Sequence, residues 1–323
     1  MKNFKSLLSR SWQSWCEFWF APQDLYNVSL FRFLLGLSML VMYLMRASEF
    51  DFFYLNNGVM PVAQALDAMP AGYQTTVPFF LTSDVGIHWQ GIAHLLLLTL
   101  FTLGVFGRSL TWLLFVINLG LIQRNISIVY GADLFGNFWL FYLSFADHNR
   151  YFSILNWFRK QKVRAERAVL QSDMLTTMAI RLIQIQLCIS YAYTGIEKLK
   201  GSAWWEGTAV WYVIGLDDLV PHDFAFMQNF PVIVALLSMS TVVFEIYFSF
   251  AVWNKKLKYP WLAAGFLFHL GTALLMDLHF FFLVMVSSYL VFLPPMRGPL
   301  SALQTRLFRY LFRRPELLQA RPE

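Results

Sequence analysis

The sequence predicts an all-α membrane protein, a polytopic bundle of about eight transmembrane helices. Hydrophobic residues make up 58% of the chain, 33 of them phenylalanine, and the mean hydropathy is +0.51. Several apolar stretches approach the roughly 20 residues that a helix needs to cross the hydrocarbon of a bilayer. Basic residues gather in alternate connections between these stretches, as membrane topology requires. The composition excludes an ordinary soluble domain.

Residues 1–20 predict an amphipathic helix that lies in the membrane interface. Its apolar stripe recurs at steps of three and four residues and consists of Phe4, Leu8, Trp12, Trp15 and Trp19. The residues between them are mostly polar. A helix with one tryptophan-rich face and one polar face is typical of an interfacial anchor.

The bundle itself is predicted over residues 28–293 of a single transmembrane domain that takes in the whole chain, 1–323. The eight spans are expected at 28–46, 92–106, 110–129, 133–147, 176–199, 231–253, 259–276 and 279–293. Two excursions outside the membrane, 47–90 and 200–230, separate some of these spans. Both contain the glycine, proline and asparagine of ordered turns, so we expect short helices in them.

The chain after the last span predicts a second surface helix. Pro294 and Pro295 end the eighth span. Residues 299–314 then place leucines on one helical face and arginines on another. This pattern is typical of a basic amphipathic helix attracted to anionic lipid.

Charge predicts the orientation of the bundle in a cytoplasmic (inner) membrane. If both termini are cytoplasmic, most of the 25 lysines and arginines fall on the cytoplasmic side. They include the basic loop 148–173 and the lysines of the turn 255–258, whereas the excursion 200–230 is acidic. The positive-inside rule therefore favours cytoplasmic N- and C-termini and places Lys198 at the extracytoplasmic end.

Composition and motifs also exclude several functions. The two cysteines, Cys16 and Cys188, are expected at different depths, so no disulfide framework is predicted. No metal-binding spacing of histidines and carboxylates occurs, and no metal site is predicted. Nucleic acid is not an expected partner, because the basic residues lie along the inner membrane surface.

The stretch 184–207 holds the strongest candidate for chemistry. Five of its residues share one helical face: Gln184, Cys188, Tyr191, Gly195 and Lys198. In one interpretation, partial desolvation leaves the Lys198 amine neutral, so that it takes a proton from a bound ligand. In the other, Lys198 is a snorkelling lysine that ends a transmembrane helix beside the aromatic residues Trp204 and Trp205.

Placing an ionisable residue inside a transmembrane span costs free energy, so we expect each such residue to have a partner. Arg32, Asp147 and Arg181 are expected near the inner ends of their helices, where they would form a structural ion cluster. Glu245 and His269 lie well inside the sixth and seventh spans. They are expected to meet each other or a ligand, or to form an interhelical hydrogen bond.

Five stretches together resemble the horizontally transferred transmembrane (HTTM) family, which includes the vitamin K-dependent γ-glutamyl carboxylase. They are LFRFLLGLSML at 30–40, FADHNRYFSI at 145–154, ISYAYTGIEKLKGSAWWEGTAV at 189–210, FEIYFSF at 244–250 and FHLGTALL at 268–275. Their order and spacing match those of the family, and the resemblance covers nearly the whole chain.

The resemblance implies roles for individual residues. Lys198 falls on the lysine that is proposed to deprotonate reduced vitamin K, and Glu197 replaces an adjacent lysine. His269 falls on a family histidine, and Glu245 stands where an acidic residue is common. The chain departs from the carboxylase at Ala132 and Asp133, where that enzyme has a histidine.

A further departure concerns the protein substrate. The carboxylase has a large lumenal domain that follows its helices and holds this substrate. This sequence carries only the membrane module, so carboxylation of a protein glutamate is not expected.

We therefore predict one site that opens outward from the bundle. Its catalytic candidates are Lys198, as general base, with Glu197 and His269. Its ligand-binding candidates are Tyr191, Gly195, Trp204, Trp205, Gly207, Glu245 and Asp133.

Three functional hypotheses follow from this site. The first is an enzyme with carboxylase-like or oxidoreductase-type lyase chemistry that uses a reduced quinone. The second is a non-enzymatic membrane protein that assists the maturation, export or immunity of a secreted peptide, for which outer residues such as Trp211, Asp217 and Asp218 would matter more. The third is a lipid or quinone binder. The expected partners are membrane lipid and a secreted or membrane peptide or protein.

Overall fold

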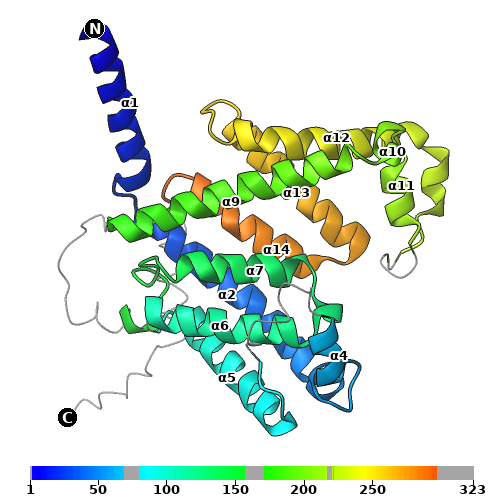
Figure 1. Cartoon of the computed structure of the whole chain (residues 1–323). Helices are drawn as coiled ribbons and strands as arrows, with labels where there is room; N and C mark the ends of the chain where they lie inside the picture. The colour runs from blue at the N-terminus through cyan, green and yellow to red at the C-terminus, as the bar shows by residue number, and fades with distance from the viewer. Residues whose placement is uncertain are drawn as a thin grey trace, which may run out of the picture.

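The computed structural model describes residues 2–68, 80–105, 107–156, 171–216, 220 and 222–296, and side chains from residue 9 onward. Over these residues the chain is helical, and its single β-bridge joins Asp24 to Gln171. The prediction of a helical membrane bundle is confirmed. Figure 1 shows most helices running along one common direction, with α1 projecting away from the others.

Helices occupy all eight predicted span positions in the described part of the chain. They are α2 (Leu25–Ala47), α5 (Asp84–Thr102), α6 (Arg108–Arg124), α7 (Gly131–Leu143), α9 (Met174–Lys198), α12 (Pro231–Ala251), α13 (Lys258–Met276) and α14 (His279–Ser288). The short helix η3 (Tyr289–Phe292) extends α14. By length and apolar composition, α2, α5, α9, α12 and α13 can cross a membrane, whereas α6, α7 and α14 are shorter.

Shorter helices occupy the two excursions. The first excursion holds α3 (Phe50–Tyr54) and α4 (Val62–Asp67), and η1 (Ile126–Ile128) follows α6. The second holds α10 (Ser202–Trp205), α11 (Ala209–Ile214) and η2 (Ala225–Asn229). Both excursions lie at the same end of the bundle, and α1 (Lys2–Phe20) lies at the other end (Figure 1).

Several boundaries differ from the prediction; the third span, for example, ends at Arg124 instead of residue 129. The second span begins at Asp84 instead of residue 92, since the Ser83 side chain accepts a hydrogen bond from the backbone of Gly86 and caps the helix. The fourth span ends at Leu143, before the predicted residue 147. The predicted tail helix 299–314 lies outside the described residues. The position of α1 in the membrane interface stays a prediction.

Packing around α2 forms the centre of the bundle. This helix contacts α5 and α14, and α14 in turn contacts α13 and α7. Phe31, Leu35 and Met39 of α2 are fully buried, as is Trp139 of α7. Gly36 allows a close approach of α5, because a Cβ atom there would lie 2.6 Å from the Thr102 hydroxyl oxygen.

The predicted ion cluster does not form. Arg32 is fully buried and donates hydrogen bonds of 2.6–3.1 Å to the carbonyl oxygens of Phe101, Thr102, Tyr151 and Phe152. The first two carbonyls belong to the last residues of α5, where a helix leaves carbonyl groups unpaired and its dipole favours a cation. The guanidinium therefore finds acceptors without a carboxylate.

The other two members of that predicted cluster also have separate partners. The Asp147 carboxylate pairs with Arg150, three residues away, at a distance of 2.6 Å between Oδ2 and Nε. Arg181 donates to the carbonyl of Phe18 in α1 at 2.8 Å and to the side chain of Gln184 at 2.9 Å. Each charged side chain has partners of its own, so the structure does not pair the three residues with one another.

Candidate functional site

The candidate site is built on an ion pair between α9 and α12. The Nζ atom of Lys198 lies 2.8 and 3.0 Å from the two carboxylate oxygens of Glu245. The Lys198 side chain is 22% exposed and that of Glu245 only 5%. The amine also lies 5.3 Å from the ring centroid of Trp204, within the range of a cation–π contact. A carboxylate and an indole therefore enclose most of this amine.

Small residues bring the two helices close enough for this pair. A Cβ atom on Gly195 would lie 2.7 Å from a side-chain carbon of Ile246 and 3.1 Å from the Cβ of Glu245. Two turns earlier in α9, the Cys188 carbonyl accepts a hydrogen bond of 2.7 Å from the Ser249 hydroxyl of α12. Lys198 is the last residue of α9, so the close contact at Gly195 places Glu245 beside the helix end.

The turn after α9 positions the indole. Gly207 adopts a φ of +73°, a left-handed conformation that glycine adopts without steric cost. A Cβ atom there would lie 2.7 Å from the Cβ of Ala235 in α12. This contact holds the short helix α10, which carries Trp204, against α12.

Two predicted site residues have partners away from the pair. Trp205 is 65% exposed and donates from its indole nitrogen to the Leu199 carbonyl at 2.7 Å. Glu197 pairs with Lys200 at 2.6 Å on the surface. Both residues are adjacent to the site in sequence but contact other groups.

A second, inner layer consists of three hydrogen-bonding side chains. The Tyr191 hydroxyl lies 2.6 Å from Nε2 of His269 and 2.5 Å from the Tyr289 hydroxyl. All three side chains are buried, and Nδ1 of His269 has no hydrogen-bond partner in the described part of the chain. Gly265 leaves room for this network, because a Cβ atom there would meet the Tyr289 hydroxyl.

The structure gives Glu245 and His269 different partners. Glu245 pairs with Lys198, whereas His269 bonds Tyr191. Tyr289 was not among the predicted site residues. A sequence signal for it is weak, since it lies near the end of a mostly apolar span and has no charged neighbour.

Asp133 belongs to a separate buried ion pair. Its carboxylate accepts bonds of 2.6 and 2.9 Å from Arg46 and one of 3.2 Å from the Tyr43 hydroxyl. It also accepts a bond from the backbone nitrogen of Tyr130 at the start of α7. These contacts connect α2 to α7, so Asp133 has a structural partner set of its own. Arg46 at the end of the first span was the sequence signal for this pair.

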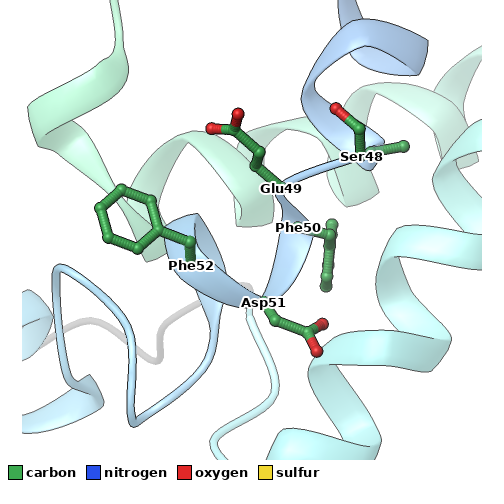
Figure 2. A pocket seen from close by; sticks show the side chains of 6 residues that line it. Ser48, Glu49, Phe50, Asp51 and Phe52 are labelled. Atoms are coloured by element: carbon green, nitrogen blue, oxygen red, sulfur yellow. The ribbon is translucent and has the colours of Figure 1, made fainter.

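Two surface hollows occur elsewhere on the described part of the chain. One, of about 620 Å³, is lined by residues 47–52, and Figure 2 shows the Glu49 and Asp51 side chains pointing apart around it. The other, of about 380 Å³, lies in the second excursion and includes Trp211 and Phe224. Neither is lined by Lys198 or Glu245.

No family model matches the chain, and no solved structure matches it significantly. The HTTM resemblance therefore stays a prediction. The chain is similar to the sporulation-delaying protein SdpB of Bacillus subtilis (strain 168), with 26% identity over 308 residues that cover 90% of this chain and 89% of SdpB.

Proposed function

We propose that this chain is a multi-pass membrane protein of a secreted-peptide pathway and that the Lys198–Glu245 pair contacts the peptide at the extracytoplasmic end of the bundle. The observation that carries the proposal is the pair itself, at the end of a helix and under an indole. The similarity to SdpB extends over nearly the full length of both chains and supports the pathway.

Two charges at a membrane boundary are costly to bury, and removing either partner is more costly still. A peptide offers replacements for both partners. Its carboxylate competes with Glu245 for the Lys198 ammonium, and its ammonium or guanidinium competes with Lys198 for Glu245. The pair therefore opens only for a ligand that supplies charge. This selectivity suits a protein that recognises a peptide among neutral lipids.

A second candidate function is general-base catalysis by Lys198 on a reduced quinone or another lipophilic acid. In this scheme the ammonium first passes its proton to Glu245, which lies 2.8 Å away. The neutral amine then takes a proton from the ligand. The inner network of Tyr191, His269 and Tyr289 favours this candidate, since hydrogen-bonded hydroxyl and imidazole groups relay protons.

The test compares peptides in the culture medium of a strain that lacks the gene and is complemented with variants. We expect wild-type protein to restore a peptide that the deletion strain lacks, and Lys198→Ala to reduce its level at least about tenfold. Lys200→Ala is the matched control, because Lys200 pairs with Glu197 on the surface. Normal peptide release by Lys198→Ala, at an unchanged protein level, would contradict the proposal.

Lys198→Arg separates the two candidates. Arginine keeps the positive charge and the carboxylate contact, but it does not lose its proton near neutral pH. If Lys198→Arg retains activity, the positive charge of the side chain is what matters. If it loses activity, the result supports Lys198 as a general base. Mass spectrometry of the released peptide adds an independent readout, because covalent chemistry on the peptide changes its mass.

A further inference from the structure

A second buried cation lies at the same end of the bundle as Lys198 and has only part of its hydrogen-bonding capacity satisfied. Arg124, the last residue of α6, has no solvent exposure. Its Nη1 atom donates to the Met60 carbonyl at 2.7 Å. Its Nε and Nη2 atoms are buried and have no hydrogen-bond partner among the residues that the structure describes. Only one of the three guanidinium nitrogens therefore has an acceptor there.

Among the described arginines, Arg32 and Arg108 also have a buried Nε atom without a partner, but Arg124 alone has two such nitrogens. Arg46 bonds the carboxylate of Asp133, and Arg108 bonds that of Asp173. The carboxylate near Arg124 is Asp84, which interacts with it electrostatically. However, Oδ1 of Asp84 accepts bonds from the backbone and side-chain nitrogens of Asn56. Over the described ranges, Arg124 consequently has no hydrogen-bonded carboxylate.

The two unpartnered atoms define the shape of a ligand. Nε and Nη2 lie on one edge of the planar guanidinium, with their N–H groups parallel, and this edge binds two oxygens of one oxyanion. Nη1 is held by Met60 and fixes the plane of the group. The ring of Phe80 lies 5.9 Å from Cζ, on the face of the cation. The free edge is thus held in one orientation.

The position of Arg124 indicates the source of the oxyanion. Helix α6 has 17 residues, which at a rise of about 1.5 Å per residue spans about 25 Å. If the first residue of α6 lies at one boundary of the hydrocarbon, its last residue, Arg124, lies near the phospholipid phosphates at the opposite boundary. Helix α4 of the first excursion packs on α6, close to its C-terminal end (Figure 1).

We propose that the Nε and Nη2 edge of Arg124 binds the phosphate of an anionic phospholipid headgroup inserted between α6 and α4. The bound lipid supplies a hydrogen-bonded counter-charge and holds α4 against α6. This site is separate from the Lys198–Glu245 pair and does not depend on the function proposed for that pair.

The test uses the purified, delipidated full chain in detergent. It is titrated separately with short-chain phosphatidylglycerol, with inorganic phosphate and with acetate, while the thermal unfolding temperature and native mass spectra are recorded. We expect one phosphatidylglycerol to bind and raise the unfolding temperature. Inorganic phosphate should act only at higher concentration, and acetate should have no effect. If phosphate is as effective as the lipid, or if acetate alone binds, the lipid assignment is wrong.

Variants assign the binding to the arginine edge. Arg124→Gln should abolish the lipid-dependent rise. Arg124→Lys keeps the charge but not the paired donors, so we expect at least about tenfold weaker binding. Arg150→Gln, at the opposite end of the bundle, should bind like wild type. If Arg124→Gln does not fold, Arg124→Lys decides. Wild-type binding by Arg124→Lys, or no lipid binding by wild-type protein, would overturn the proposal and leave a buried water as the partner.

Discussion

At the scale of single residues, the Lys198–Glu245 pair is held together by the cost of separating it. The Glu245 carboxylate is almost fully buried, and Lys198 is its bonded cation. Pairing of two desolvated charges offsets their loss of hydration only when both partners are present. The sequence showed each residue as an unusual charge at membrane depth, but it did not show that they meet.

Removing one partner should therefore cost more than removing both. We expect Lys198→Met to destabilise the protein by about 3–5 kcal/mol, because it leaves the Glu245 carboxylate buried without a counter-charge. The double variant Lys198→Met/Glu245→Gln should recover most of that loss. Unfolding by sodium dodecyl sulfate in mixed micelles measures the stability of the single and the double variant. Equal losses for the single and double variants would show that the pair contributes no coupling.

At the scale of elements, the contact between α9 and α12 sets the geometry of the site. Gly195 is the point of closest approach, and a Cβ atom there would also lie 3.0 Å from the backbone nitrogen of Ile246. Close contacts through small residues are a common way to pack helices in membranes, where the hydrophobic effect does little to drive association. The position of Glu245 next to the end of α9 depends on this contact.

Gly195→Ala should push α9 away from α12 and loosen the ion pair. We expect a loss of about 1–3 kcal/mol, typical of overpacking, together with a loss of the activity tested for Lys198. Gly271→Ala is the matched control in α13, because a Cβ atom there meets nothing within 4 Å. It should be neutral or stabilising by up to about 1 kcal/mol. The two variants are compared in the same unfolding assay. A similar effect of both would refute the packing argument.

A second contact between helices should make the stability of the protein sensitive to acid. Asp173 caps α9 and bonds Arg108 at the start of α6. Burial raises the pKa of Asp173, but hydrogen bonds from Arg108 and Thr176 outweigh this and lower the pKa to about 2. An unfolded aspartate has a pKa of about 3.9. The carboxylate therefore stabilises the fold above about pH 4, and this contribution is lost as the pH falls from about 4 to about 2.

The measurement is the unfolding temperature of wild type and Asp173→Asn between pH 3 and pH 7. We expect Asp173→Asn to be less stable at pH 7 and the difference to shrink towards pH 3. Side-chain exposure limits the size of the effect, since half of the Asp173 side chain is in solvent. A difference that stays constant across this range would show that the pair does not titrate with folding.

At the scale of the whole molecule, the direction of each helix places Lys198, Arg46 and Arg124 at one end of the bundle. Both excursions lie at that end (Figure 1). The orientation of this end relative to the cytoplasm is a prediction from charge alone. If it is right, the candidate site and the proposed lipid site face the outside of the cell, where a secreted peptide would be met.

Cysteine labelling tests this orientation. In a background with Cys16→Ser and Cys188→Ser, we expect Ser202→Cys in the second excursion to react with a membrane-impermeant maleimide in intact cells. Lys256→Cys, in the turn between α12 and α13, should react only after permeabilisation. The reverse pattern would place the Lys198 site in the cytoplasm and contradict the proposed contact with a secreted peptide.

The sequence by itself determined the class of fold, the positions of the helices and the candidate lysine. These depend on apolar runs and on local periodicity, which are properties of neighbouring residues. Capping at Ser83 is equally local and could have been read. The partners of Lys198, Arg32 and Asp133 were decided by the tertiary structure alone, because the energy of a buried charge depends on groups that are distant in the chain and are brought close only by helix packing.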